Sequence, residues 1–234
     1  MTRRVVGLDG CREGWVAVEL VDGAVAAVTV VPRAVDILDG SHEAAAVDIP
    51  IGLLDVAVRD ADAAARAVLG RRAATVFSAP PRAVVDLVAG APGVSHAEAT
   101  ALAADTTGVG VSIQAFRLLP KVIEIDAIVA GGAEVLEVHP EVAFAHLAGE
   151  ALPRKTSWAG SEARRAILTA AGVVLPASFP GAERCAPDDV LDAAVCAVTA
   201  DRVASGGSVT TLPDPPTQFL GGRPVVIHAP APRS

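Results

Sequence analysis

Acidic side chains stand at the ends of several strand-like segments of this chain. Asp9 closes the apolar segment VVGLD, Asp48 lies near the end of AAAVDI, and Glu137 lies near the end of a third such segment. Asp189 and Asp192 follow in the first turns of a late helical segment. Strand ends and the loops beside them are where α/β sheets form ligand sites. Carboxylates that converge there repel one another unless cations separate them, which points to a hard divalent cation such as Mg²⁺.

Two such cations about 3.5–4 Å apart would suit phosphodiester hydrolysis, because they activate a water molecule and stabilise the leaving oxygen. A lone Asp after a strand, however, is more often a turn former or a helix cap. The motif Ala-Pro-Asp-Asp predicts that Asp188 caps a helix. Asp192 is a stronger functional candidate, because it lies at the margin of the apolar stripe that Leu191, Val195 and Val198 form at helical spacing.

His139 precedes Pro140 and permits two interpretations. As a functional residue it would shuttle a proton or orient Glu137, since imidazole titrates near neutral pH. As a structural residue it would start a helix, with Glu141 favoured by the helix dipole in the first turn. No HExxH motif is present, which disfavours a zinc hydrolase, and no Walker loop or G-x-G-x-x-G motif supports a nucleotide cofactor.

Basic residues gather in one stretch of the chain. Between residues 59 and 121 bases outnumber acids, although the formal net charge of the whole chain is −8. Arg71, Arg72 and Arg82 flank the pair Val76-Phe77, and we expect them to clamp a phosphate around a buried anchor. Lys155 is one of two lysines in the chain. Its compact charge would reach a substrate phosphate, unless its position is incidental.

Composition excludes several classes of protein. Hydrophobic residues make up 52% of the 234 residues, which is enough apolar surface to exclude disorder. Aromatic residues make up only 3%, which disfavours the base-stacking platforms that grip single strands. The negative charge excludes a generic nucleic-acid binder, so local basic groups or metal ions must hold any anionic substrate. Three cysteines make no disulfide framework, which favours a cytoplasmic location, and no apolar run approaches the roughly 18 residues of a membrane span.

The elements that must position these residues follow from the hydrophobic periodicity. Segments 5–9, 15–20 and 24–31 predict an antiparallel meander of three strands, and segment 44–49 predicts a buried strand that ends at Pro50. The remaining expectations are helices at 33–39, 56–69, 82–89, 95–105, 112–129, 141–147, 161–171 and 188–204, and strands at 134–138 and 224–228. This order predicts an α/β fold with a mixed sheet, flanking helices and a helical insertion at about 56–131 in a single domain.

Six segments resemble a family of uncharacterised bacterial and archaeal proteins that are predicted nucleases with the ribonuclease H-like fold. They are GLDGCREGW at 7–15, VDIPIGLLD at 47–55, LGRRAATVFSAPPR at 69–82, LEVHPEVAF at 136–144, the K…G…R run from Lys155 through Gly160 to Arg164, and DDVLDAAVCAVTADR at 188–202. They span nearly the whole chain in the family's order. The resemblance implies one ribonuclease H-like domain over 1–234, with functional acids at Asp9, Asp48 and a C-terminal helical Asp.

The leading hypothesis is therefore a metal-dependent phosphodiesterase, most simply a nuclease, with Mg²⁺ or Mn²⁺ held by Asp9, Asp48 and Asp192. Its substrate would be nucleic acid or a smaller phosphoryl compound, and the charge balance favours the smaller substrate or a short structured oligonucleotide. Two alternatives stay open: a phosphotransferase or phosphohydrolase of the sugar-kinase and actin-like group, and a non-catalytic binding protein on the same fold. Ala/Val-rich surfaces are also compatible with a homodimer.

Overall fold

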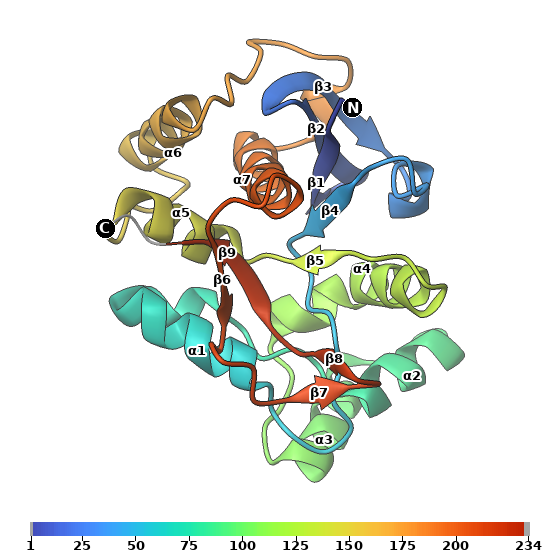
Figure 1. Ribbon diagram of the computed structural model, residues 1–234. Coiled ribbons are helices and arrows are strands. Elements are labelled where there is room, and N and C mark those ends of the chain that lie inside the picture. The colour runs from blue at the N-terminus through green and yellow to red at the C-terminus, as the bar shows by residue number, and fades with distance from the viewer. Residues whose placement is uncertain (1, 232–234) are drawn as a thin grey trace. The chain divides into compact units, whose positions relative to one another are not determined.

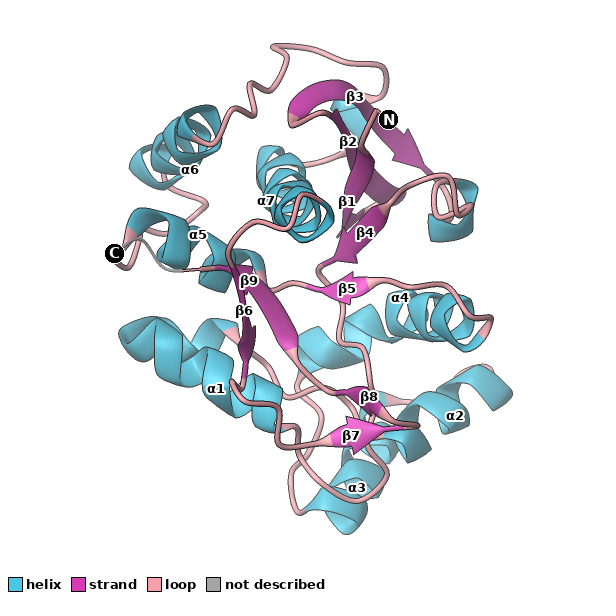
Figure 2. Ribbon diagram, viewed as in Figure 1, coloured by secondary structure: helices cyan, strands magenta, loops and turns pink. Residues whose placement is uncertain are grey.

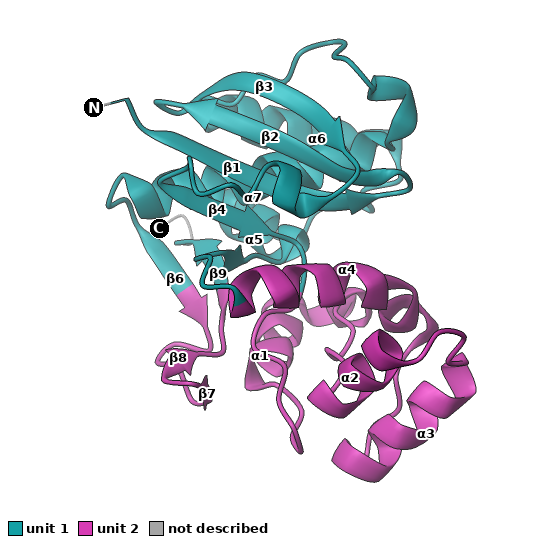
Figure 3. Ribbon diagram, turned by 90° about the vertical axis from the view of Figure 1, so that its right-hand side faces the viewer, with its two compact units in different colours: residues 1–49, 131–210, 228–234 teal, residues 50–130, 211–227 magenta. Residues whose placement is uncertain are grey.

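The computed structural model describes residues 2–231, and the chain divides into two compact units (Figure 3). The first unit comprises Met1–Ile49, Gly131–Thr210 and His228–Ser234, and the second comprises Pro50–Ala130 and Thr211–Ile227. Most of the second unit is the segment in which the sequence predicts inserted helices. Within the described part of the chain, no helix has both the length and the apolar character needed to cross a lipid bilayer.

A five-stranded mixed sheet forms the frame of the first unit (Figure 2). Its strands are β1 (Arg4–Cys11), β2 (Gly14–Val21), β3 (Ala24–Val31), β4 (Ala44–Val47) and β5 (Leu136–Glu137), in the spatial order β3-β2-β1-β4-β5. The first three strands pair antiparallel, whereas β4 runs parallel to β1 and β5 runs parallel to β4. The predicted mixed α/β fold, with a meander followed by parallel strands, is confirmed.

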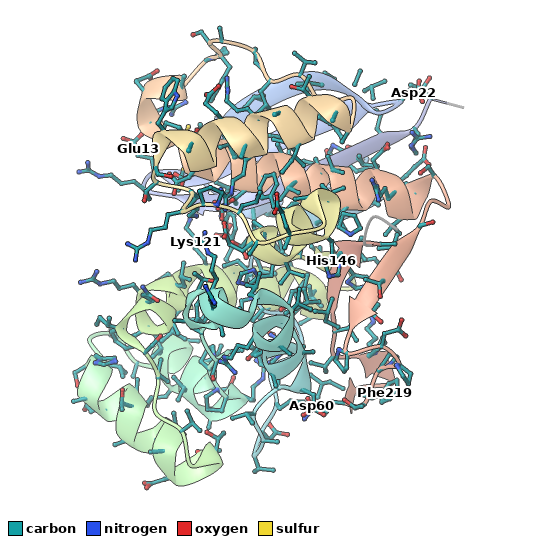
Figure 4. All side chains as sticks on the ribbon, turned by 90° about the vertical axis from the view of Figure 1, so that its left-hand side faces the viewer. Glu13, Asp22, Asp60, Lys121, His146 and Phe219 are labelled. Atoms are coloured by element: carbon teal, nitrogen blue, oxygen red, sulfur yellow. The ribbon has the colours of Figure 1, made fainter. Side chains whose placement is uncertain are left out.

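Helices α5 (Pro140–Ala148), α6 (Trp158–Ala170) and α7 (Pro187–Ala204) complete most of the first unit, together with the 3₁₀ turns Ala34–Asp36 and Ala182–Arg184. Two further strands, β6 (Val209–Leu212) and β9 (Ile227–Pro230), pair with each other. His146, on the last turn of α5, donates from Nδ1 to the carbonyl oxygen of Pro230 at 2.9 Å (Figure 4).

Helix α7 packs against β1, β2 and β4 (Figure 1). The contact is close because Gly7, in the middle of β1, has no side chain: a Cβ atom there would lie 2.1 Å from the backbone nitrogen of Ala197 and 2.2 Å from the carbonyl oxygen of Ala193. The facing stretch of α7, from Ala193 to Ala197, is fully buried. Small residues on both surfaces therefore bring the helix axis near the sheet.

The second unit contains four α-helices: α1 (Asp60–Leu69), α2 (Arg82–Gly90), α3 (His96–Thr107) and α4 (Ile113–Ala130). A 3₁₀ helix, Gly70–Thr75, follows α1, and the short strands β7 (Phe219–Leu220) and β8 (Arg223–Pro224) form a hairpin. Ser95 and Glu98 cap the start of α3 reciprocally. A two-pronged ion pair from Arg82 to Asp126, at 2.6 and 2.7 Å, joins α2 to α4.

The structure corrects several predicted boundaries. Helix α1 begins at Asp60 instead of residue 56. The negative charges of Asp60 and Asp62 interact favourably with the positive N-terminal end of the helix dipole, whereas Val56 and Val58 are exposed. Helix α6 begins at Trp158 instead of 161, because the side chain of Ser157 caps it by accepting from the backbone N–H of Gly160. The strand predicted at 134–138 is only the two residues of β5, and the one predicted at 44–49 ends at Val47. The strand predicted at 224–228 is two strands, β8 and β9, and β6 and β7 were missed.

We predict that Gly7→Ala destabilises the protein by about 2 kcal/mol or more, because its methyl group would collide with the backbone of α7. In a chain of this size each kcal/mol corresponds to about 2–4 °C in Tm, so thermal unfolding measures the effect. Gly90→Ala is the matched control, since it adds the same methyl group to open space at the end of α2. Equal Tm values for the two variants would show that the close contact between α7 and β1 is unimportant.

Candidate active site

Asp9 and Asp48 lie side by side because of the parallel register of β1 and β4. Leu8 pairs with Val47, so Asp9 on β1 lies beside Asp48, the residue that directly follows β4, and both project from the face that carries α7. The backbone N–H of Asp48 donates to the carbonyl oxygen of Leu8 at 3.2 Å, which continues the ladder. Asp9 is buried and its Oδ1 accepts from the N–H of Gly10 at 2.7 Å, whereas Asp48 is partly buried.

Asp192 joins this pair from α7. Asp192 lies directly before Ala193, whose carbonyl oxygen faces Gly7 on β1, and only 2% of its surface is exposed. Burial raises the pKa of Asp9 well above its usual range, and the charges of Asp48 and Asp192 add to this effect. Burial and the charge of Asp192 likewise raise the pKa of Asp48. We call Asp9, Asp48 and Asp192 the carboxylate cluster.

The ammonium group of Lys155 lies at the carboxylate cluster. Its Nζ is 2.5 Å from Oδ2 of Asp192 and 3.4 Å from Oδ2 of Asp188. Burial lowers the pKa of Lys155, but the negative charges of Asp192, Asp188 and Asp9 outweigh burial, so the pKa is raised and the side chain stays charged. Burial raises the pKa of Asp192 to about 6 although Lys155 opposes this shift.

Asp192 has one oxygen that the ion pair does not satisfy. Its Oδ1 is buried and has no hydrogen-bond partner among residues 2–231. A buried carboxylate oxygen without a partner is unfavourable, since the desolvation of the charge is uncompensated. An additional donor or cation at this oxygen would remove that penalty.

A buried arginine holds the loop that carries Lys155. Arg164 is fully buried on α6 and donates from Nη1 to the carbonyl oxygens of Pro153 and Gly160, at 3.0 and 2.9 Å. Its Nη2 donates to Oε1 of Glu141 on α5 at 2.6 Å. Gly160 allows the loop to pass close to α6, since a Cβ atom there would overlap the carbonyl group of Arg154.

The sequence reasoning gave Arg164 and Glu141 no role in the site. Arg164 is part of the K…G…R run, so the sequence did contain a signal for it. The structure shows why these residues occur together: Arg164 donates to the carbonyl oxygens of Pro153 and Gly160 and so fixes the loop that carries Lys155. Glu141 pairs with Arg164, and its charge also acts on Asp48 and Asp192. Both residues therefore help to position the site without belonging to the carboxylate cluster.

The other predicted acids have different surroundings. Glu137, the buried last residue of β5, raises the pKa of Asp48 by its charge, after burial and Asp192. Asp189 accepts from the backbone N–H of Ala186 at 2.9 Å and so stabilises the start of α7. The prediction that Asp188 caps this helix is wrong: the N-cap residue is Ala186, because Pro187 takes the first helical position, and Asp188 instead pairs with Lys155.

His139 is the N-cap residue of α5, and its side chain makes no capping hydrogen bond to the helix. It thus occupies the helix-start position that one of the two interpretations predicts. Proton transfer by His139 stays a prediction.

The three arginines of the predicted phosphate clamp all lie in the second unit. Arg71 and Arg72 belong to the 3₁₀ helix after α1, and Val76 behind them is buried. The guanidinium group of Arg82 is paired with Asp126, and more distantly with Asp86 at 3.5 Å. Lys155, the fourth predicted substrate-binding residue, lies in the first unit and contacts the carboxylate cluster. A phosphate clamp at the three arginines stays a prediction.

The carboxylate cluster suits a hard divalent cation by its donor chemistry. It offers carboxylate oxygens, one of them buried and unpartnered, which is the ligand type that Mg²⁺ and Mn²⁺ take. In the described part of the chain no three His, Cys, Asp or Glu side chains form a ready-made metal site. Mg²⁺ does not need one, because it often binds one or two carboxylates and completes its shell with water and substrate phosphates.

We predict that Asp48→Asn raises the stability of the metal-free protein at neutral pH. The raised pKa values mean that the folded cluster binds protons more tightly than the unfolded chain. Its favourable contribution is therefore present below the ordinary pKa of aspartate and is lost as the pH rises through the raised pKa values, which is about 6 for Asp192. We expect the Tm of the variant to exceed that of the wild type by roughly 3 °C at about pH 8 in EDTA, with a smaller gain at about pH 5.

The control for this prediction is Asp105→Asn, which removes one charge from an exposed position on α3. A gain that is equal in both variants, or that does not change with pH, would contradict electrostatic repulsion within the carboxylate cluster.

We also predict that Lys155→Met destabilises the protein by about 2 kcal/mol, because it leaves Asp192 with neither oxygen bonded. This destabilisation is smaller than the one expected for a fully buried ion pair, since 35% of the lysine side chain is exposed. Chemical denaturation of the double-mutant cycle with Asp192→Asn measures the coupling. If Lys155→Met has the same effect with Asp192 and with Asn at that position, the ion pair does not stabilise the site.

Comparison with known proteins identifies the family of this chain. No curated protein and no solved structure matches it. A family model does match, over residues 7–218, and this range includes the carboxylate cluster, Lys155 and Arg164. The chain therefore belongs to the family described as "Protein of unknown function (DUF429)".

Proposed function

We propose that this protein is a metal-dependent phosphodiesterase, a nuclease that acts on nucleic acid or on a smaller phosphoryl substrate. One observation carries the proposal: two neighbouring parallel strands and one helix bring three carboxylates together in a largely buried place, where Oδ1 of Asp192 has no partner among residues 2–231. Repulsion of this kind destabilises a fold, so a functional requirement is the simplest reason for it.

The arrangement of the first unit supports a ribonuclease H-like assignment. A three-stranded meander leads to parallel strands, the first acid lies on β1, the second directly follows β4, and the third lies on the long helix that packs on both. These are the positions that the resemblance of the sequence implies for the functional acids. The residues of the site are the basis of the proposed function, and the fold supports it only by analogy.

Asp9, Asp48 and Asp192 would hold the cation, with Mg²⁺ or Mn²⁺ as the ions that best suit their oxygens. When bound there, such a cation supplies a more acidic water and stabilises the leaving oxygen of the phosphodiester. Lys155 would neutralise a non-bridging phosphate oxygen. The support for this role is that 35% of its side chain is exposed while its Nζ contacts the cluster. Arg164 and Glu141 keep the Lys155 loop in this position without touching the substrate.

The net charge of −8 bears on substrate choice. A long duplex would experience net repulsion from the negatively charged chain, whereas a short strand or a small phosphodiester would depend mainly on the local charges of Lys155 and the cation. The proposal therefore favours short substrates.

We predict that Mn²⁺ binds the wild-type protein saturably in titration calorimetry and that Asp48→Asn abolishes this binding, because it removes one anionic ligand. In Mg²⁺ or Mn²⁺ the same variant should lose at least about 10²-fold in the hydrolysis of a small phosphodiester such as bis(p-nitrophenyl) phosphate or of short labelled oligonucleotides.

Asp105→Asn, with the same change of charge on α3, should bind Mn²⁺ and hydrolyse these substrates like the wild type. Silent titrations of the wild type at millimolar Mn²⁺, repeated with single-stranded and branched oligonucleotides present, would refute the metal-dependent mechanism and favour a binding protein.

A further inference from the structure

A cavity of about 790 Å³ opens in the first unit beside the carboxylate cluster. Its walls come from the start of α6, from the segment between α6 and α7, and from the first turns of α7. The volume is within the range of cavities that bind small organic ligands. Asp188 lines the cavity and also pairs with Lys155, which binds Asp192, so one chain of charged groups leads from the cavity to the cluster.

Trp158 is the unusual residue of this wall. It is the first residue of α6, and 82% of its surface is exposed, whereas the other tryptophan of the chain, Trp15, is fully buried. Indole is the largest apolar side chain, and leaving it in water forgoes much stabilisation. Phe179 and Pro187 line the same cavity. A planar ligand would cover these surfaces.

The polar lining fits a neutral ring with hydrogen-bonding edges. Ser161 supplies a hydroxyl group, Glu162 and Asp188 supply carboxylates and Arg165 supplies a guanidinium group, so both donors and acceptors are present. A phosphate attached to such a ring would extend towards Lys155 and the carboxylate cluster. Scarce aromatic residues argue against an extended stacking platform, but a single stacking position needs only one indole.

We infer that this cavity binds the nucleobase of a nucleotide whose phosphate lies at the carboxylate cluster, with Trp158 stacking on the base. This inference rests on the proposed function for the role of the cluster and adds the recognition of an unpaired base. The ligand chemistry is a nucleotide, free or as an unpaired unit of a strand.

The two tryptophans make the test direct, because Trp15 is shielded and Trp158 reports on the cavity. We predict that AMP or UMP, added in EDTA, quenches the tryptophan fluorescence saturably, whereas ribose 5-phosphate and inorganic phosphate do not. In titration calorimetry Trp158→Ala should weaken nucleotide binding at least about tenfold. Phe219→Ala is the control, since it removes an exposed aromatic residue that belongs to β7 of the second unit (Figure 4).

Running the same titration on Asp48→Asn separates this inference from the proposed function. Nucleotide binding that persists there, and that Trp158→Ala weakens, supports the cavity even if Mn²⁺ binding fails. Comparison of AMP with a short single strand and with the same sequence as a duplex shows which source supplies the base, and we expect the duplex to bind most weakly. Absence of saturable quenching by every nucleotide and strand, or equal affinity of Trp158→Ala and wild type, would overturn the inference.

Discussion

The repulsion among three carboxylates, enforced by the packing of α7 on β1, is the constraint on which the site depends. Gly7 and the alanines of α7 let the helix come so close that Asp192 must share a buried space with Asp9 and Asp48. Burial raises the pKa of all three groups, and their mutual charge raises those of Asp9 and Asp48 further. Apolar packing in the 21-residue core cluster, much of it from α7, offsets this unfavourable term.

Lys155 reduces the repulsion and is itself held by contacts distant in the sequence. Its loop depends on Arg164, which donates to two backbone carbonyl groups of the loop and first turn of α6 and to Glu141 on α5. The guanidinium group also lies over the ring of Phe144, at 5.4 Å from its centroid. A lysine could not make this set of contacts, because it lacks the planar fork of donors. The position of the Lys155 charge beside the cluster thus depends on the contacts of the buried Arg164.

Local sequence signals predicted many of the elements closely. The bounds of β3 were predicted to the residue, and β1, β2 and the helices α2, α3 and α7 within two residues, because short apolar β-branched runs mark the strands and helix-forming composition marks the helices. The convergence of Asp9 and Asp48 followed from the rule that parallel strands end at one edge of a sheet. Strand β6 was missed because its partner, β9, lies across a proline-rich segment, and no local pattern signals such a pairing.

The positions of Lys155 and Asp188 show where sequence reasoning stops. Whether Lys155 faces the cluster depends on the buried contacts of Arg164, which lie nine residues further along, and on the absence of a side chain at Gly160. Asp189, instead of Asp188, accepts from the backbone at the start of α7, because Pro187 takes the first helical position and Ala186 is the N-cap residue. A shift of one residue turns a helical side chain by about 100°.

If the proposed function is correct, the cavity beside the cluster and Lys155 together explain how a negatively charged protein would bind an anionic substrate. Long-range attraction is not available at a net charge of −8, so affinity must come from short-range contacts. An exposed indole supplies such a contact without any charge, and Lys155 supplies local charge where the phosphate would lie. Salt weakens base stacking only a little, whereas it strongly weakens binding along a phosphate backbone. A site that combines stacking on Trp158 with the local charge of Lys155 therefore favours small or unpaired substrates over duplexes.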